Sequence, residues 1–255
     1  DSMPKSRQDD CMPFEPEMLG GNMGGVERRG DTVHRAVGPW TPAVHALLTH
    51  LSDRVPAVPQ VLGFDPEGRE VLSYLPGDVV DTDHQLLTDR QLCNLVEWTR
   101  QFHVAVEDFD HAGPWRYFEV PNPTLIGHND IAPYNACFNG DELTGSFDWD
   151  LAGPTNPLAE LAFIAWNCVP LTRDLGSAEA ARRLALISDS YGLHSAREIL
   201  DAVPARIRVM LEGIPARAAS GDVGMQRLVA LGEPERSQRT LDALVGRIPD
   251  IARCL

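Results

Sequence analysis

Three polar side chains within one short stretch have the types and the order that phosphoryl transfer requires. They lie in residues 125–135 and in the Phe-Asp-Trp-Asp sequence at 147–150. In phosphoryl transfer one carboxylate orients the attacking hydroxyl, while an Asn and a second carboxylate hold Mg²⁺ on the nucleotide phosphates. Asp130, Asn135 and Asp148 follow one another in that order. We therefore predict Asp130 as the catalytic base, and Asn135 and Asp148 as Mg²⁺ ligands.

Two neighbouring residues are predicted to support these three. His128 orders the loop through a hydrogen bond, and Asp150 acts as a second-sphere or second-metal carboxylate. The simpler alternative is that these loop acids are only solvated. However, Asp148 and Asp150 follow the strand-like residues 144–147, so they lie at a strand end, where clefts form. This placement favours the functional interpretation.

A glycine-rich stretch at residues 19–26 is the first candidate for nucleotide binding. Its glycines allow backbone N–H groups to close over phosphates. On this basis Gly21, Asn22 and Gly24 are predicted to contact the nucleotide. The alternative is a plain flexible turn, and the stretch is not a Walker loop because it lacks the G-K-[ST] ending.

Arg35 is the second candidate for nucleotide binding. The only lysine of the chain is Lys5, in the polar N-terminal segment, so a basic residue working inside the fold must be arginine or a protonated histidine. Strand alternation places Val33 and Arg35 on one face, where Val33 covers an adenine and Arg35 reaches the phosphates. A surface arginine is the alternative, and Arg28 and Arg29 are weaker candidates for the same task.

The elements that must position these residues form a β-rich part followed by a helical part. Thr41 and a following Pro predict the N-terminus of a helix that runs to Leu51. Strands are expected at 60–64, 69–75 and 144–147, and helices at 88–106 and 158–169. The predicted fold class is α+β with two lobes. The expected division is a flexible tail (1–17), a nucleotide-binding lobe (18–77) and a helical catalytic and substrate-binding lobe (78–255).

Composition narrows the class of protein and partner. Among 255 residues the hydrophobic fraction is 43% and the formal charge is −15, values of a soluble protein that does not bind nucleic acid. The charge is compatible with cationic small molecules, although a solvated acidic surface explains most of it. No apolar run of about 20 residues and no signal-like N-terminus occur, so we expect a cytoplasmic protein without membrane partners. The five scattered cysteines fit neither a disulfide framework nor a zinc site.

The motif at 128–135 and 147–150 resembles the signature of the aminoglycoside phosphotransferase/choline kinase-like family. That signature runs H-x-D-x-x-x-x-N and is followed by D-W-[DE]. Phe102-His103 and the Tyr-Leu-Pro-Gly sequence at 74–77 are also similar to that family, and the similarity spans about residues 19–166. It implies a bilobal protein-kinase-like fold that binds ATP (or GTP) and Mg²⁺. By the same resemblance the hinge that meets adenine is formed by Ser73, Tyr74 and Leu75.

The sequence departs from the family pattern at three places. Arg35 stands where the family has its phosphate-contacting lysine. Val44 and His45 stand where members commonly place the glutamate that pairs with this lysine. Asn156 and Glu160 replace the acidic pair that follows the metal-binding Asp. These changes affect the phosphate-binding half of the site more than the half that carries out transfer.

The resemblance implies an antibiotic-resistance type of kinase, which passes the γ-phosphate to a hydroxyl of an aminoglycoside-like or other amino-bearing compound. Acidic residues of the helical lobe are expected to bind the ammonium groups of such an acceptor. A housekeeping kinase of choline, a sugar or an amino alcohol is an alternative. A nucleotide-binding pseudokinase is another, since the lysine and glutamate are missing, but it conflicts with retention of Asp130, Asn135 and Asp148.

Overall fold

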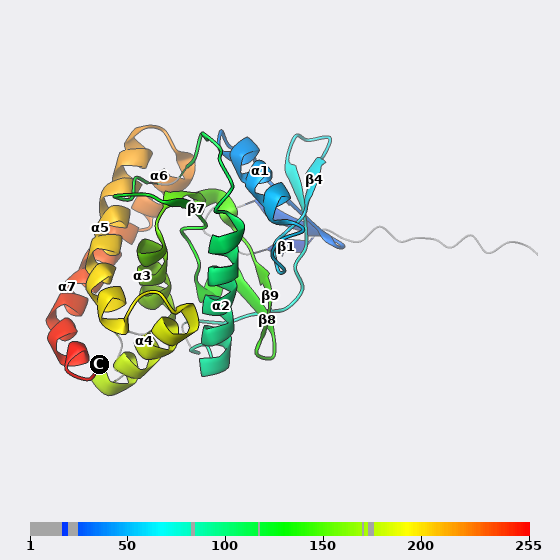
Figure 1. The fold of residues 1–255 in the computed structure, drawn as a ribbon. Coiled ribbons are helices and arrows are strands. Elements are labelled where there is room, and N and C mark those ends of the chain that lie inside the picture. Colours follow the sequence, from blue (N-terminus) through cyan, green and yellow to red (C-terminus); the bar gives the residue numbers. More distant parts are fainter. Residues whose placement is uncertain (1–16, 20–24, 83–84, 117, 170, 173–175) are drawn as a thin grey trace, which may run out of the picture.

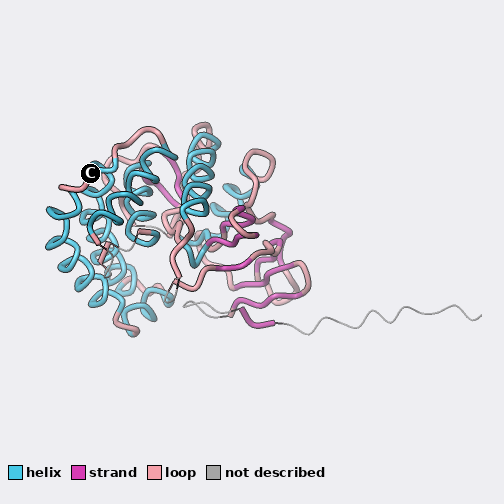
Figure 2. Tube along the Cα trace, turned by 90° about the horizontal axis from the view of Figure 1, so that it is seen from below, coloured by secondary structure: helices cyan, strands magenta, loops and turns pink. Residues whose placement is uncertain are grey.

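The chain folds into a β-rich part and a larger helical part. The computed structural model describes residues 17–19, 25–82, 85–116, 118–169, 171–172 and 176–255. The first sheet and helix α1 (Thr41–Leu51) lie at one side of the molecule, and helices α3 to α7 lie at the other (Figure 1). Seen from below, strands and helices are segregated in the same way (Figure 2). The architecture is therefore α+β, as expected from the order of the patterns.

The first sheet has five antiparallel strands in the order β1-β2-β3-β5-β4. Gly30, with φ of 61°, provides the left-handed turn between β2 and β3, a conformation that glycine adopts without strain. The register places Arg35 of β3 opposite Glu70 of β5, so both side chains lie on one face of the sheet. The strands are β1 (Glu17–Leu19), β2 (Val26–Arg29), β3 (Thr32–Arg35), β4 (Val61–Phe64) and β5 (Glu70–Ser73).

Helix α1 has the predicted bounds but begins differently. Its N-cap is Trp40, without a side-chain cap bond, and the Thr41 hydroxyl accepts a hydrogen bond from Gly38 N at 2.9 Å. Thr41 therefore stabilises the turn that precedes the helix, whereas we had expected it to cap the helix itself. The apolar face of α1, including Leu47, Leu48 and Leu51, is fully buried.

Two small sheets carry the loops of interest. One has the order β6-β8-β9 and the other pairs β7 with β10. Short 3-10 turns form the last residues of the two motif segments. These elements are β6 (Asp78–Val79), β7 (Leu125–Gly127), η1 (Pro133–Asn135), β8 (Ala136–Asn139), β9 (Glu142–Ser146), η2 (Trp149–Leu151) and β10 (Gly153–Thr155).

Most helices of the larger part pack around the main apolar core, and a second, smaller apolar cluster joins α5 to α6. Thr88 caps α2 and forms a capping box with Gln91, which explains why the helix starts there. Trp149 is buried in this core and its ring packs edge-on against Phe102 of α2 at 5.3 Å. The helices are α2 (Asp89–Ala105), α3 (Pro157–Cys168), α4 (Ser177–Tyr191), α5 (Ala196–Ala219), α6 (Val223–Ala230) and α7 (Glu233–Ala252).

Five predicted elements are confirmed, and each of their ends lies within two residues of the predicted position. They are the strands at 60–64, 69–75 and 144–147 and the helices at 88–106 and 158–169. Most of the predicted tail (1–17) lies outside the described residues, although Glu17 begins β1. The lobe boundary at 77/78 stays a proposal, supported by the pairing of β6 with β8.

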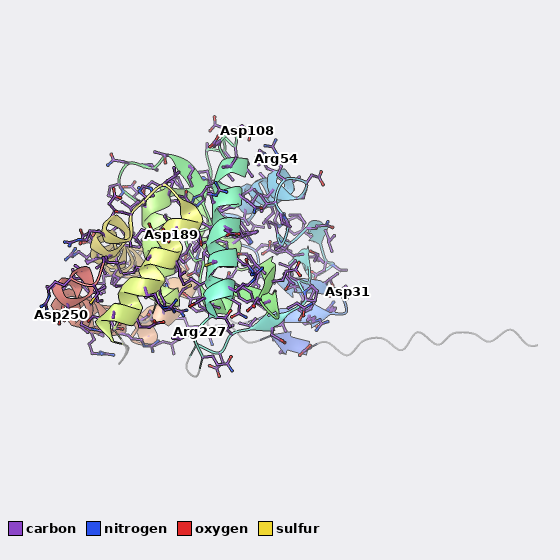
Figure 3. The ribbon with its side chains drawn as sticks, turned by 60° about the horizontal axis from the view of Figure 1, so that its bottom comes forward. Asp31, Arg54, Asp108, Asp189, Arg227 and Asp250 are labelled. Carbon is purple, nitrogen blue, oxygen red and sulfur yellow. The ribbon has the colours of Figure 1, made fainter. Side chains whose placement is uncertain are left out.

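At the surface, Arg54 and Asp108 lie together and form an ion pair at 2.8 Å (Figure 3). Among the described residues no helix is long and apolar enough to span a membrane.

Candidate active site

Asp130 lies in the loop after β7, where side-chain hydrogen bonds hold its carboxylate in place. Asn135 Nδ2 donates to Asp130 Oδ2 at 2.8 Å and to the Asp130 carbonyl at 3.0 Å. The Tyr134 hydroxyl donates to Asp130 Oδ1 at 3.2 Å. Burial, and then the nearby charge of Asp148, raise the pKa of Asp130 to about 8. A divalent cation beside Asp148 would offset the second of these effects.

His128 connects this loop to the second motif segment. Its Nδ1 accepts from Asp130 N at 3.3 Å, and its Nε2 donates to the Phe147 carbonyl at 3.1 Å. Burial lowers the pKa of His128, so the ring is neutral and can both accept and donate. The imidazole also lies 4.4 Å from the Trp149 ring. This geometry fits the ordering role predicted for His128.

The carboxylate of Glu160 fixes the same loop through hydrogen bonds. The sequence did not predict this role. Its Oε1 accepts from Asn129 N at 2.6 Å, and its Oε2 accepts from His103 Nε2. Burial alone would raise the pKa of Glu160, but His103 and the Asn129 N–H lower it overall. The carboxylate therefore stays ionised and ties Asn129, whose φ is 65°, to helix α2. Asn156, the other departure in this region, accepts from Ala159 N and caps α3.

Asp148 and Asn135 present oxygen atoms of the kind that Mg²⁺ prefers. Asp148 has φ 61° and ψ 63°, a left-handed conformation that costs a non-glycine residue about 1–3 kcal/mol and is common at functional sites. Its side chain is 39% exposed. Because Asn135 uses its amide nitrogen on Asp130, its Oδ1 remains available as an acceptor. The donor set fits one divalent cation; among the described residues no three His, Cys, Asp or Glu side chains form a metal cluster.

Arg35 extends from β3 to both carboxylates of the Asp-Trp-Asp segment. Its Nη1 lies 3.4 Å from Asp148 Oδ1, and its Nη2 bonds to Asp150 Oδ1. Arg28 and Arg29, the weaker candidates, are occupied elsewhere. The Arg28 guanidinium stacks on the Tyr74 ring at 3.7 Å, and Arg29 pairs with Glu27. Arg35 is thus the arginine of this strand pair that joins the candidate site.

A carboxylate does pair with Arg35, but it comes from a strand and not from helix α1. Glu70 of β5 accepts from Arg35 Nε at 2.8 Å, and its other oxygen lies 2.7 Å from His45 Nε2. Glu70 is 2% exposed. His45, at the position where the family commonly has a glutamate, therefore links α1 to the basic residue through Glu70. The sequence indicated that the family's lysine–glutamate ion pair is absent. An ion pair between Arg35 and Glu70 takes its place.

Arg116 brings a second guanidinium to the same cluster. Its Nη1 lies 3.2 Å from Asp150 Oδ2, while Nε and Nη2 bind both oxygens of Asp222 at 2.8 and 2.7 Å. Its guanidinium also lies 4.2 Å from the Trp40 ring, just before α1. Asp150 is therefore held between two arginines, which suits a positioning role better than that of a second metal ligand.

The hinge residues connect the two parts at the end of β5. Ser73 N donates to Gln60 O and Tyr74 N donates to Asp31 O, at 2.9 and 2.8 Å. The Leu75 carbonyl lies 3.6 Å from Cys137 Sγ. Among the described residues no hydrogen bond engages the Leu75 backbone N–H, so this group can serve a ligand.

The structure thus gathers Arg35, His128, Asp130, Asn135, Asp148 and Asp150 into one region, with Ser73, Tyr74 and Leu75 in the connecting hinge. Gly21, Asn22 and Gly24 lie outside the described residues. The individual roles of all these residues stay predictions. The sequence did not point to Glu70, Arg116 or Asp222, because their contacts depend on pairing between distant segments.

Comparison with known proteins decides the family. A model described as the phosphotransferase enzyme family matches residues 119–199. The chain is also 32% identical over 193 residues to a trifolitoxin immunity protein from Rhizobium leguminosarum bv. trifolii, with 72% of each chain covered. The chain belongs to the phosphotransferase enzyme family. The resemblance to this family that the motif indicated is therefore confirmed.

Solved structures of phosphotransferases share the fold. An amicoumacin kinase in complex with AMP-PNP and Ca²⁺ has a TM-score of 0.63 at 12% identity, covering 91% of this chain and 89% of that one. A variant of aminoglycoside 2'-phosphotransferase-IIIa in complex with GDP has a TM-score of 0.58 at 17% identity, covering 89% and 93%. The bilobal protein-kinase-like fold predicted for this phosphotransferase is confirmed.

Proposed function

We propose that this phosphotransferase is a small-molecule kinase that uses Mg²⁺ and ATP or GTP. The observation that carries the proposal is the convergence of Asp130, Asn135 and Asp148 with Arg35 in one region. These groups supply a base, oxygen ligands for a cation, and a cation for phosphate. Two solved structures that share the fold contain AMP-PNP and GDP. They support nucleotide binding in general, but they do not indicate which base the nucleotide carries.

Each residue has a task that follows from its contacts. Asp130 accepts the proton of the acceptor hydroxyl, with its carboxylate aimed by Asn135 and Tyr134. Arg35 donates to the phosphates, and the Leu75 N–H, which no described residue engages, binds the nucleotide base. Asn135 and Asp148 would hold the divalent cation, which neutralises charge on the phosphates when it is bound. Positioning and charge neutralisation then supply most of the rate.

The rebuilt Arg35–Glu70 pair argues against the pseudokinase alternative. That alternative was based on the missing lysine and glutamate, and Arg35 with Glu70 places a paired basic group beside Asp148 and Asp150 in their stead. The 32% identical immunity protein supports a role in protection against a toxic compound. A resistance kinase is therefore favoured over a housekeeping kinase of choline or a sugar.

The direct test is transfer by the purified protein with Mg²⁺ and labelled ATP or GTP to a broad panel of hydroxyl compounds. We expect transfer to at least one compound, lost in Asp130→Ala with nucleotide binding kept. Asp189→Asn is a matched control, because Asp189 lies exposed on α4 of the helical part (Figure 3). Absence of both hydrolysis and transfer across the panel contradicts the proposed function.

A further inference from the structure

Two guanidinium groups from different parts of the fold hold the carboxylate of Asp150. Arg35 of β3 bonds to its Oδ1, and Arg116, from the loop after α2, donates to its Oδ2 at 3.2 Å. Among the described residues these two arginines are the hydrogen-bond partners of this side chain. The side chains of Asp150 and Arg35 are each 14% exposed. The carboxylate is therefore mostly withdrawn from water, and the two arginines compensate its charge.

Arg116 is anchored independently of Arg35. Its Nε and Nη2 bind both oxygens of Asp222 at 2.8 and 2.7 Å, and Asp222 also caps α6 by accepting from Met225 N. The Arg116 side chain is 3% exposed, and its guanidinium lies 4.2 Å from the Trp40 ring. Because these contacts fix the guanidinium, its Nη1 can stay on Asp150 when Arg35 moves.

Arg35 differs, because carboxylates occupy the nitrogens that it would use for phosphate. A guanidinium binds phosphate most strongly in a bidentate manner, through two nitrogens of one edge. The Nε of Arg35 is taken by Glu70 at 2.8 Å, so the edge that remains consists of Nη1 and Nη2. These two nitrogens contact Asp148 and Asp150. Asp148 is a predicted cation ligand and so has a second partner for its charge, whereas Asp150 would keep Arg116.

We propose that Arg35 exchanges Asp150 for a phosphate of the nucleotide, and that Arg116 is the positioning residue that allows this exchange. The proposal rests on the proposed function, in which Arg35 binds the phosphates. A buried carboxylate that loses its cationic partners is strongly unfavourable. Without Arg116 the guanidinium of Arg35 would therefore stay on Asp150. With Arg116 in place, Asp150 remains paired both before and after the nucleotide binds.

A double-mutant cycle on nucleotide affinity, measured without turnover, tests the exchange. Titration calorimetry with Mg²⁺ and AMP-PNP or GMP-PNP gives Kd for the parent, Arg116→Gln, Asp150→Asn and the double variant. We expect Arg116→Gln to raise Kd about tenfold in the parent but less than about twofold in the Asp150→Asn background, where position 150 carries no charge. A purely structural role of Arg116 would lower Tm without this coupling.

Two outcomes of the cycle overturn the proposal. An equal rise in Kd in both backgrounds means that Arg116 acts on the phosphates directly or through the fold. An unchanged Kd in an Arg116→Gln protein that is folded by circular dichroism means that Arg35 needs no such support. Arg227→Gln is the matched control, because Arg227 lies exposed on α6, the helix that Asp222 caps (Figure 3).

Asp150→Asn alone gives a second measurement, which decides the question if Arg116→Gln does not fold. Asparagine keeps the shape of the side chain but holds Arg35 less strongly in the free protein, so Kd should fall about threefold. An unchanged or higher Kd overturns the exchange. A parent protein that binds neither nucleotide analogue contradicts the proposed function itself. Binding by the parent without the expected coupling contradicts the exchange alone.

Discussion

Glu70→Gln tests whether a strand carboxylate positions Arg35. Glu70 is buried between Arg35 Nε at 2.8 Å and His45 Nε2 at 2.7 Å. Glutamine keeps the shape of the side chain and an acceptor oxygen for Arg35, but it removes the charge. The Arg35 guanidinium then remains bound to the two carboxylates of Asp148 and Asp150. We expect it to shift toward them, and so to compete with the cation for Asp148.

The size of the effect follows from the contacts. Two unit charges 2.8 Å apart attract by about 6 kcal/mol at an effective dielectric constant of about 20. Much of this is offset because both groups lose hydration on burial. Hydrogen bonds to charged groups contribute about 1.5–3 kcal/mol net, so we take about 2 kcal/mol for the loss. If all of it appears in the transition state, kcat/KM for the nucleotide falls about 30-fold.

Steady-state transfer at varied nucleotide and Mg²⁺ concentrations measures this prediction. Because Glu70 acts through Arg35 on the metal-binding segment, the Mg²⁺ concentration for half-maximal rate should rise about tenfold. Glu67→Gln is the control, as Glu67 lies in the same sheet region and is 61% exposed. Adding His45→Glu to Glu70→Gln returns a carboxylate from α1 and should recover part of the rate. Wild-type kinetics and Mg²⁺ dependence in a folded Glu70→Gln protein refute the reasoning.

Three further predictions concern the base, the loop and the stability of the sheet. Asp130→Asn should lower turnover by about 10²–10⁴-fold, with nucleotide affinity in calorimetry little changed. Glu160→Gln removes a buried carboxylate that accepts from His103 Nε2 and Asn129 N, at a cost of about 3 kcal/mol, so thermal denaturation should show a Tm about 6–12 °C lower. Hydrogen bonds from Arg29 and then Arg69 lower the pKa of Glu27 from 4.5 to about 2. The pKa of Glu27 is lower in the folded state than in the unfolded state. The contribution of ionised Glu27 to the stability of the fold is therefore complete above pH 4.5 and is lost as the pH falls toward 2. Urea midpoints between pH 5 and pH 2 should therefore fall less steeply in Glu27→Gln than in the parent.

Local patterns in the sequence predicted the parts of the site that lie close together in the chain. Asp130 and Asn135 are five residues apart, and the Asn135 amide reaches the Asp130 carboxylate directly. The helical periodicity of apolar residues over 88–106 predicted α2 to within one residue at each end. Such features depend on backbone geometry over a few residues, which the sequence expresses directly.

Ion pairs between segments that are distant in the chain could not be predicted from such local patterns. Arg35 and Glu70 meet because β3 and β5 are neighbours, although α1 and β4 lie between them in the chain. Arg116 reaches Asp222 over more than a hundred residues, from a loop without any periodic pattern. Each acid in these pairs looks like an ordinary solvated residue in the sequence, since only the tertiary arrangement buries it.

The two departures from the family pattern at positions 35 and 45 compensate for each other. The guanidinium of Arg35 binds Glu70 through Nε and the Asp-Trp-Asp carboxylates through both terminal nitrogens. A lysine ammonium is a single point charge and could not span these partners at once. Because Arg35 pairs with Glu70 of β5, a glutamate from α1 is not required to pair with the basic residue. His45 of α1 contacts Glu70 instead. The predicted phosphate-binding half of the site is therefore built around arginine, in a chain whose only lysine is Lys5.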